Sequence, residues 1–558
     1  MARKPVTPTD DEQQKEAAGT VSRRGFLTNI GAGAAGAAGA LAIQPADAIA
    51  QLAEPPPAMG HGTTRPDRFS RLFNLPPFAQ ATTTVKNKLL ELGQLGGILD
   101  ARDPLEIGPI RLITEPQLSP NNRDNPGNTA GVTFFGQFLD HDMTFDAASP
   151  LGVPTVPGNS PNERTPSFDL DTVYGGGPTA SPQLYNSSDR AKLKIEHGGL
   201  FEDLPRTSDG TAIIGDPRND ENMMISGLHA AFILFHNRVV DYIRDYGAAS
   251  LMQGAEAGMP MEETEFEALS STTFTQARRI VTWHYHWIIL NEFLPLIVGS
   301  TLMINLLHFG RQFYRPVRGQ QSIPVEFQGA VYRFGHSLVR PSYRANLAGN
   351  NGGGPFFGFI FDPAGEGQSD PVDLRGGARA PRRFIGWQTF FDFGGAQTTN
   401  VRNNKRVDTK ISTSLFKLPL GTIPGGAPPI SLPQRNLLRH LTWSLPSGQA
   451  IANAMGIQPL TTSQLSDFAQ FGVGFERNTP LWPYILREAD VLANGHRLAG
   501  IGGRIVAEVF VGLLQLDNNG YLTVNPNWRP TLPARTPGNF TVVDLLTFAG
   551  VDPASRGQ

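Results

Sequence analysis

Four short stretches of this sequence combine side chains that could do chemistry. The first contains Gln137, Asp140, His141 and Asp142. At 100° per residue in a helix, Gln137, Asp140 and His141 share one face, whereas Asp142 points elsewhere. A neutral imidazole beside an amide can take a proton from a bound small molecule. Taken alone, however, such a helix is more typical of a solvated or capped surface.

The other three stretches are equally ordinary when each is taken alone. Arg218 precedes Glu221 by three residues, a spacing at which two side chains share a face and often form a surface ion pair. A lone histidine among aromatic and apolar residues, as at position 336, is usually a hydrogen-bonded core residue. The third stretch contains Arg333 and His336, and the fourth contains Asn436 and Arg439.

Helices are the elements that must position these side chains. Helical periodicity dominates the sequence, and strand-like alternation is brief and scattered. No internal repeat, charged linker or low-complexity segment divides the chain. The sequence therefore predicts a single large, mainly α domain over residues 76–558, with little β-structure. The clearest helical runs are residues 228–235, 266–298 and 485–514, the last interrupted at Gly495 and Gly502.

The composition excludes several classes of protein. The 558 residues include no cysteine, so disulfides, thiolate ligation, iron-sulfur clusters and Cys-rich zinc sites are excluded. Any metal must be bound by histidine and oxygen ligands. The formal net charge of -3 at pH 7 gives no basic surplus for binding nucleic acid or anionic membranes.

The N-terminal segment has the features of an export signal. Arg23 and Arg24 precede a weakly apolar, Gly/Ala-rich stretch at residues 30–43, and Ala-x-Ala patterns follow. A membrane span needs about 20 residues, so no transmembrane anchor is expected. Residues 1–50 resemble a twin-arginine signal peptide, which predicts a periplasmic or secreted protein. Residues 51–75 are expected to form a disordered or extended lead-in.

Taken together, the four stretches resemble, in order, segments of the animal-type haem peroxidases, the family of myeloperoxidase and lactoperoxidase within the peroxidase-cyclooxygenase superfamily. The similarity covers nearly all of residues 80–552, and the export signal suggests a bacterial-looking member. The family's Gln-x-x-Asp-His-Asp matches residues 137–142, Arg-x-x-Glu matches 218–221, Arg-x-Gly-His matches 333–336, and Asn-x-x-Arg with its later Leu-Pro matches 436–446. The resemblance implies a myeloperoxidase-type haem peroxidase domain.

The resemblance also implies how one face of haem b is bound. His336 is the expected proximal ligand of the iron, and Asn436 is expected to accept a hydrogen bond from its other ring nitrogen. A neutral amide acceptor gives the imidazole less anionic character than a carboxylate would. Arg333 and Arg439 are expected to pair with the haem propionates, because a bidentate guanidinium fits a carboxylate.

On the opposite face, the resemblance implies the catalytic residues. His141 is expected to accept the proton of hydrogen peroxide and to return it to the departing oxygen. Arg218 is expected to stabilise the negative charge that develops as the peroxide bond breaks. Gln137 is expected beside the site where peroxide or a halide binds. The implied activity is peroxide reduction coupled to oxidation of a halide or small organic substrate, as in the response to oxidative stress.

Two carboxylates match those that form ester bonds to haem in the mammalian enzymes. These are Asp140 and Glu221, and whether they form the esters here is left open. The mammalian enzymes that add a third link use a methionine directly after the glutamate. This chain has Asn222 there, so a sulfonium link is expected to be absent.

The remaining carboxylate of the first stretch, Asp142, matches a calcium ligand of the family. Closely spaced oxygen donors suit a hard cation. Asp171 stands where the mammalian enzymes have serine, so an oxygen ligand is kept and a charge is added. The other expected calcium ligands are Thr165, Ser167 and Asp169.

Three alternatives remain open. The first is a haem-dependent fatty-acid dioxygenase of the same superfamily, although the radical tyrosine that cyclooxygenases carry three residues before the proximal histidine is Arg333 here, and Tyr332 is one residue off. Another is a non-catalytic haem-binding protein. The third is a non-haem metallohydrolase, which is disfavoured because histidines two residues apart diverge on a helix. Its candidate ligands are Asp140, His141, Asp142, His284 and His286.

The sequence leaves the reducing substrate and the oligomeric state open. Halides, thiocyanate, phenols and lipids are all compatible with the motifs, since selectivity depends on the shape of the access channel. The aromatic run at residues 283–287 is expected to be core packing rather than a radical site.

Overall fold

The computed structural model describes residues 66–197, 201–247, 251, 272–348, 354–368, 370–378, 382–423 and 426–558. The expected export signal at residues 1–50 lies outside these described residues. Of the expected lead-in, residues 66–75 are described, and they run without helix along the core. Phe69, Leu72 and Phe73 are buried there, so the folded unit includes residues before position 76.

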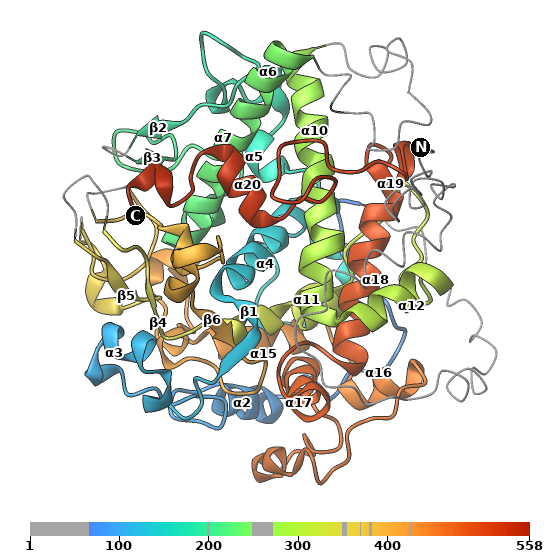
Figure 1. Cartoon of the computed structure of the whole chain (residues 1–558). Helices are drawn as coiled ribbons and strands as arrows, with labels where there is room; N and C mark the ends of the chain where they lie inside the picture. Colours follow the sequence, from blue (N-terminus) through green and yellow to red (C-terminus); the bar gives the residue numbers. More distant parts are fainter. Residues whose placement is uncertain are drawn as a thin grey trace, which may run out of the picture.

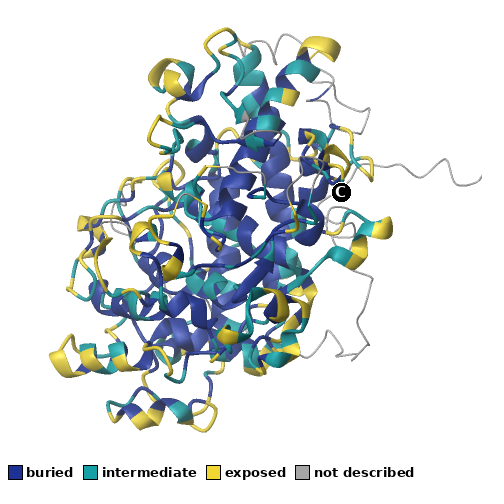
Figure 2. Ribbon diagram, turned by 90° about the vertical axis from the view of Figure 1, so that its left-hand side faces the viewer, coloured by how far each residue is buried: buried dark blue, intermediate teal, exposed yellow. Residues whose placement is uncertain are grey.

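The described chain forms a mainly α domain around one hydrophobic core (Figures 1 and 2). At its centre lie α4 (Ala130–Met143), α7 (Met223–Tyr246) and α10 (Thr273–Ile288). The ring of Phe138 in α4 stacks on that of Phe232 in α7, with centroids 4.6 Å apart. Apolar side chains surround most of α4, and its polar residues gather on one face, as its periodicity predicts.

Helix α7 is long and apolar enough to cross a membrane, but 83% of its apolar window is buried inside the molecule. It contacts α4, α10 and α20 (Val542–Ala549). Its apolar character is therefore that of a central core helix.

The long apolar run that ends at Val298 is divided by a change in helix type. Helix α10 passes into a π-helical turn, η6 (Ile289–Phe293), and then into α11 (Leu294–Val298). A π-turn carries one extra residue, which re-aims the side chains that follow it. Phe293 and Ile297 thereby reach the cavity described below.

The C-terminal run is also divided, at one of the two expected glycines. Helix α17 (Leu481–Ala493) ends at Asn494 and Gly495, which have φ of 50° and 70°, and such left-handed residues commonly end helices. Helix α18 (Gly500–Leu516) contains Gly502 in its interior, so the break expected at Gly502 is wrong. A Cβ on Gly502 would lie 3.1 Å from Ile485, which indicates that glycine permits close packing of α18 on α17.

The described β-structure consists of three two-stranded antiparallel sheets, and this confirms the expectation of little β-structure. The pairs are β1 (Asp124–Thr129) with β6 (Asn403–Lys405), β2 (Glu196–His197) with β3 (Glu202–Asp203), and β4 (Ser342–Arg344) with β5 (Phe357–Phe359). Backbone bonds from Ala130 to Arg402 and from Gly131 to Phe390 tie the start of α4 to the segment before β6.

The other helices surround this centre. Two short ones carry candidate residues: η5 (Pro217–Asp220) precedes α7, and η7 (Val331–Phe334) leads into α14 (Gly335–Leu338). The remaining α-helices are α2 (Thr83–Leu92), α3 (Pro109–Thr114), α5 (Asp171–Tyr174), α6 (Gly177–Ala180), α12 (Ser300–Phe309), α13 (Val325–Gly329), α15 (Leu432–Thr442), α16 (Gly448–Ala454) and α19 (Tyr521–Val524).

Candidate active site

A cavity of about 250 Å³ lies between α4 and the segment formed by η7 and α14. His141 at the end of α4 and His336 in α14 both line it. Tyr332 ties the two sides together, since its hydroxyl donates to the carbonyl oxygen of Gly136 at 2.9 Å.

The hydrogen bonds of His141 determine which ring nitrogen carries the proton. His141 Nδ1 lies 2.8 Å from Asn219 Oδ1, and the amide nitrogen of Asn219 lies 3.0 Å from His229 Nδ1. Because Oδ1 can only accept, Nδ1 of His141 is the donor, and Nε2 of the neutral ring stays free to accept a proton. Burial, with the nearby charge of Arg218, lowers the pKa of His141 to about 3.

Arg218 is held by one carboxylate and two carbonyl groups. Its Nη2 donates to Asp216 Oδ2 at 2.7 Å and to the carbonyl oxygens of His141 at 3.1 Å and Thr144 at 2.6 Å. Its guanidinium also lies 4.3 Å from the ring centroid of Phe145. The expected surface pairing with Glu221 is not found, and Arg218 instead lines the cavity as a fixed positive charge.

Gln137, Glu221 and Asn222 form a small network on the cavity wall. The side-chain nitrogen of Gln137 donates to Glu221, and Asn222 Nδ2 lies 3.3 Å from Gln137 Oε1. Burial raises the pKa of Glu221 to about 7 and raises that of Asp140 above its ordinary value. Both carboxyl groups line the cavity, so both are placed where the resemblance expects groups that face a haem.

On the other side of the cavity, His336 meets its expected partner. His336 Nδ1 lies 2.8 Å from Nδ2 of Asn436, whose Oδ1 accepts from Arg333 Nη1 at 3.3 Å. The partner is as expected, but the amide is turned the other way, because the charged arginine takes the oxygen. An imidazole that binds iron through Nε2 carries its proton on Nδ1 and needs that oxygen. A 180° turn of the Asn436 amide supplies it and releases Arg333.

The arginines of the cavity differ in their partners. Arg439 Nη1 pairs with Asp146 at 2.6 Å, so this expected propionate partner already has a carboxylate. Arg333 has no carboxylate partner within the described part of the chain, and burial lowers its pKa to about 9. Arg435, which sequence reasoning missed, lines the same cavity and bonds to the backbone oxygens of Ala427 and Pro429.

Three observations fit the cavity to a large planar group that carries acidic side chains. First, Arg333 is a half-buried cation that lacks a carboxylate partner among the described residues. Second, Oε1 of Gln328, which lines the cavity, is buried without a hydrogen-bond partner. Third, a Cβ on Gly335 would meet no atom within 4 Å, so the space over the residue before His336 is open. The residues present therefore fit a haem.

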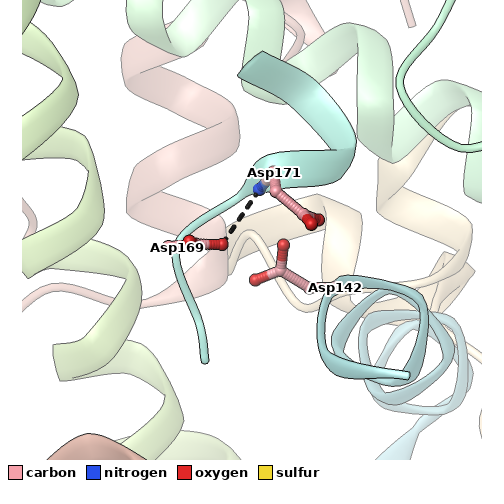
Figure 3. Close-up of side chains that lie close together, drawn as sticks. All are labelled: Asp142, Asp169 and Asp171. Atoms are coloured by element: carbon pink, nitrogen blue, oxygen red, sulfur yellow. Dashed lines mark hydrogen bonds between the residues drawn. The ribbon is translucent and has the colours of Figure 1, made fainter. Parts of the chain in front are cut away.

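Three carboxylates converge near the end of α4 (Figure 3). One ligand oxygen each of Asp142, Asp169 and Asp171 lies within 4.8 Å of the others, and these three residues are called the acidic cluster below. Asp142 is fully buried, and its Oδ1 has no hydrogen-bond partner. Burial and the neighbouring carboxylates raise the pKa of Asp142 and raise that of Asp169 to about 7. Such an arrangement suits a divalent cation.

The other two expected cation ligands lie in the same loop. The backbone nitrogen of Thr165 donates to Asp171 Oδ2 at 3.2 Å, and that of Ser167 donates to the carbonyl oxygen of Thr165 at 2.7 Å. Thr165 is exposed, whereas Ser167 is buried. The loop thus holds Asp171 through its backbone.

The alternative metal site is not assembled. His284 Nδ1 is bonded to the carbonyl oxygen of Ile280 at 2.8 Å, and His286 Nε2 to that of Phe168 at 2.9 Å. Among the described residues, the carboxylate cluster that could hold a metal ion contains no histidine. Trp283, Tyr285 and Trp287 are buried, as expected of aromatic core packing.

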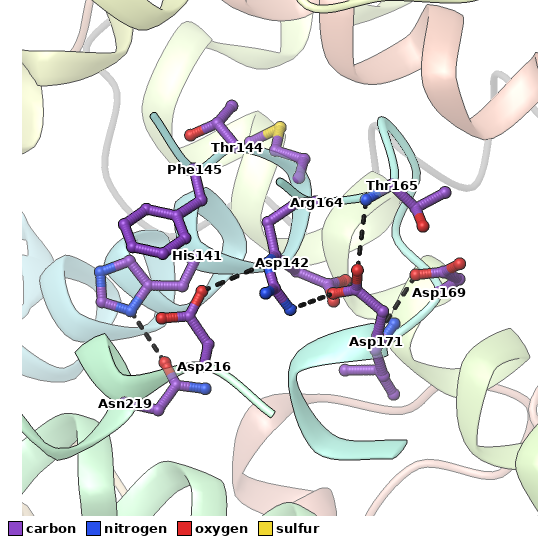
Figure 4. Close-up of polar contacts among 12 residues, drawn as sticks. His141, Asp142, Thr144, Phe145, Arg164, Thr165, Asp169, Asp171, Asp216 and Asn219 are labelled. Carbon is purple, nitrogen blue, oxygen red and sulfur yellow. Dashed lines mark hydrogen bonds and ion pairs between the residues drawn. The ribbon is translucent and has the colours of Figure 1, made fainter. Parts of the chain in front are cut away.

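Sequence reasoning missed several residues around His141 and Arg218. Asn219 sets the tautomer of His141, and Asp216 is the carboxylate partner of Arg218. Both lie in the stretch Gly215–Asn219, directly beside or two residues from Arg218. Their polar side chains were the signal in the sequence that could have pointed to these contacts. Arg164 bridges Asp216 and Asp171 (Figure 4), and its role rests on contacts that link distant parts of the chain.

Residues 149–355 match the family model described as animal haem peroxidase. Over this range the chain is similar to the animal haem peroxidases. The matched range includes Arg218, Glu221, Arg333 and His336, and α4 with His141 lies just before it.

Curated peroxidases are similar to this chain over a limited stretch. The chorion peroxidase of Drosophila melanogaster is 32% identical over 206 residues, which are 31% of this chain and 23% of that protein. A peroxidasin homologue of Caenorhabditis elegans is 24% identical over 199 residues, 32% of this chain and 14% of that protein. The chain therefore spans less than a quarter of the length of these relatives.

Solved structures share the fold of this chain. Peroxidase A from Dictyostelium discoideum superimposes with a TM-score of 0.52 at 15% identity, covering 78% of this chain and 88% of that chain. A variant of the fatty acid alpha-dioxygenase of Oryza sativa, solved with palmitic acid, has a TM-score of 0.50 at 14% identity, covering 86% of this chain and 79% of that chain. Peroxidases and dioxygenases thus occur on this fold.

Proposed function

We propose that this protein is a haem peroxidase that reduces hydrogen peroxide and oxidises a halide or a small organic substrate. The observation that carries the proposal is that His141 and His336, which belong to different segments, line the same cavity. His336 binds the iron from α14, and His141 and Arg218 act on peroxide from the opposite wall. Gln137 lies beside them, on the wall where peroxide or a halide binds.

Haem, when bound, supplies the two-electron reduction of peroxide and the later oxidation of the reductant. The protein supplies proton transfer and charge. Nε2 of His141 accepts a proton from peroxide and delivers it to the departing oxygen, while Asn219 keeps the Nδ1 proton in place. Arg218, fixed by Asp216, stabilises the negative charge on the departing oxygen in a site shielded from water.

The remaining cavity residues hold the cofactor. Asn436 orients His336 through Nδ1, and Arg333 and Arg435 pair with the propionates, with Arg439 beside them. Asp140 and Glu221 line the cavity and would face the haem; an ester bond would replace a C–H bond of a haem methyl group, with hydrogen peroxide as the two-electron oxidant. Until such a bond forms, Glu221 accepts from Gln137, and Asn222 offers no thioether for a third link.

We also propose that the acidic cluster binds calcium, with Thr165 and Ser167 contributing oxygen ligands. A dication relieves the mutual repulsion of three closely spaced carboxylates, whose pKa values are raised by burial and by one another. The site adjoins His141 in sequence, so the cation fixes the end of α4.

A test combines spectra with steady-state rates. Purified protein loaded with haem is expected to show a Soret band and to consume peroxide when supplied with halides, thiocyanate, phenols or fatty acids in turn. His336→Ala is expected to lose the five-coordinate haem spectrum. Arg218→Gln is expected to keep haem and to lower kcat by about 100- to 1,000-fold. Retention of full activity and an unchanged spectrum in His336→Ala would refute the assignment.

A fatty-acid dioxygenase is the second candidate, because Tyr332 lines the cavity next to apolar residues such as Phe293 and Ile297. Its hydroxyl donates to the carbonyl oxygen of Gly136. Tyr332 lies one residue before Arg333, the position at which cyclooxygenases carry the radical tyrosine. Oxygen uptake with palmitic acid that is abolished in Tyr332→Phe, with peroxidase activity retained, would favour this candidate. A non-catalytic haem-binding protein would show the Soret band and neither activity.

We further propose that the protein is exported by the twin-arginine route, on the strength of Arg23 and Arg24 and the stretch that follows them. Cell fractionation is expected to recover the shortened protein outside the cytoplasm. Replacement of both arginines by lysine is expected to retain it inside.

A further inference from the structure

The acidic cluster and Arg218 are connected through two side chains to which the proposed function gives no coupling role. Arg164 lies between them: its Nη1 is 3.5 Å from Asp171 Oδ1, and its Nε is 3.5 Å from Asp216 Oδ2. Asp216 in turn holds Arg218 at 2.7 Å. Figure 4 shows Arg164 between Asp171 and Asp216.

The geometry indicates that Arg164 is shared rather than fixed. Both of its carboxylate distances exceed those of a good hydrogen bond, and its Nε is buried without a hydrogen-bond partner. Asp216, by contrast, is fully buried and bonded to Arg218 through both carboxylate oxygens. In such a dry environment, ion pairs are poorly screened, so a change at Asp171 is felt at Asp216.

The charges of these side chains are incomplete without a cation. When all are ionised, the acidic cluster and Asp216 carry four negative charges, and Arg164 and Arg218 carry two positive ones. One divalent cation balances the remainder. The buried and unpartnered Oδ1 of Asp142 gives the cation an independent point of attachment.

We propose that Arg164 and Asp216 are positioning residues that couple cation binding at the acidic cluster to anion binding beside Arg218. A cation draws Asp171 toward itself and weakens its hold on Arg164. Arg164 then pairs more closely with Asp216, which relaxes its hold on Arg218. The guanidinium of Arg218 is thereby freed to face an anionic ligand in the cavity. The inference rests on the proposed function, which places Arg218 beside that ligand.

Linkage gives the coupling a quantitative test. Cyanide, an anionic probe, is titrated against haem-loaded protein and followed through the Soret band, first after chelation and then with calcium. Calcium affinity is measured by calorimetry with and without cyanide. We expect calcium to tighten cyanide binding by about fivefold or more, and cyanide to tighten calcium binding by the same factor.

Variants separate this route from the others that are available. In Arg164→Gln, both ligands are expected to bind, and the coupling factor is expected to fall below about twofold. The direct electrostatic interaction between the cation and the anion accounts for this remaining coupling. Arg164→Lys is expected to keep part of the coupling. Arg278→Gln is the matched control: Arg278 donates to the backbone of Asp169 at 3.2 Å and is expected to keep the whole factor.

Three outcomes would overturn the inference. Coupling of wild-type size in Arg164→Gln would mean that the effect passes directly through space or along α4 from Asp142 to His141. Equal binding of cyanide with and without calcium would mean that there is no coupling. Absence of calcium binding, measured on protein without haem, would mean that there is no cation effect to couple to anion binding. Asp216→Asn repeats the test if Arg164→Gln fails to fold, whereas loss of the Soret band in the wild-type protein would refute the proposed function itself.

Discussion

At the scale of single residues, the site depends on how each polar group is satisfied. His141 is useful as a proton acceptor because Asn219 accepts from its Nδ1 and because burial and Arg218 keep it neutral. Arg333 is suited to an anionic group because no described carboxylate neutralises it. Residue identity alone gives neither property, since each arises from a neighbour.

The first residue-scale prediction concerns pH. Because the pKa of His141 is lowered from about 6.5 to about 3, the ring stays neutral and able to accept a proton as the pH falls. The rate constant for reaction with hydrogen peroxide is therefore expected to stay level from pH 8 to about pH 4, measured by stopped-flow absorbance. Glu221, whose pKa is about 7, is replaced by glutamine as a control. A midpoint near pH 6.5 in both proteins would contradict the prediction.

The second residue-scale prediction concerns the cavity arginines. Arg333→Met and Arg435→Met each remove a cation without a described carboxylate partner, so each is expected to weaken haem binding by about tenfold or more, since a charged hydrogen bond contributes roughly 1.5–3 kcal/mol. Haem transfer to an acceptor protein measures the affinity. Arg477→Met, at a side chain 77% exposed, is expected to have no effect. An unchanged affinity in Arg435→Met would mean that Arg435 only holds the loop at Ala427 and Pro429.

At the scale of elements, α4 positions more of the site than any other described helix. It carries Gln137, Asp140 and His141 toward the cavity and Asp142 toward the acidic cluster, as a period of 3.6 residues requires. Backbone hydrogen bonds hold its start to the segment before β6. At its end, Asp142 accepts a hydrogen bond from the backbone nitrogen of Leu170. The helix is therefore held at both ends.

A substitution at the start of α4 tests this role. A Cβ on Gly131 would come within 2.6 Å of three ring atoms of Phe391, so Gly131→Ala must displace the ring or the helix. We expect a loss of stability of about 1–3 kcal/mol and weaker haem binding, measured by denaturant unfolding and by haem titration. Gly158→Ala, where a Cβ meets nothing within 4 Å, is the control. Equal stability of the two variants would show that the Phe391 ring moves aside without loss of free energy of unfolding.

At the scale of the whole molecule, one core holds segments that are far apart in sequence around the cavity. Its lining comes from residues between Val132 and Arg439, and the segment at Phe69 to Phe73 packs into the same core. With three closely spaced carboxylates in the acidic cluster, the fold carries an electrostatic strain that a bound cation would relieve.

The whole-molecule prediction follows from that strain. A ligand that binds only the folded state stabilises it by about 2.7 kcal/mol at 100 times its Kd. Removal of calcium by a chelator is therefore expected to lower the Tm of the wild-type protein, measured by calorimetry, and excess calcium is expected to restore it. In Asp169→Asn, the effect of the chelator is expected to be smaller. The same Tm with chelator and with calcium would refute the calcium proposal.

The sequence by itself determined the fold class and the chemical types at the site. Periodicity predicts the helices, and the four ordered motifs predict which residues meet, because both depend on local spacing and on a resemblance that follows the chain. Tertiary structure alone decided the tautomer of His141, the reversed amide of Asn436, the carboxylate partners of the arginines and the contacts of Arg164. These depend on contacts between segments tens to hundreds of residues apart, and a one-dimensional pattern does not contain the distances that select one partner over another.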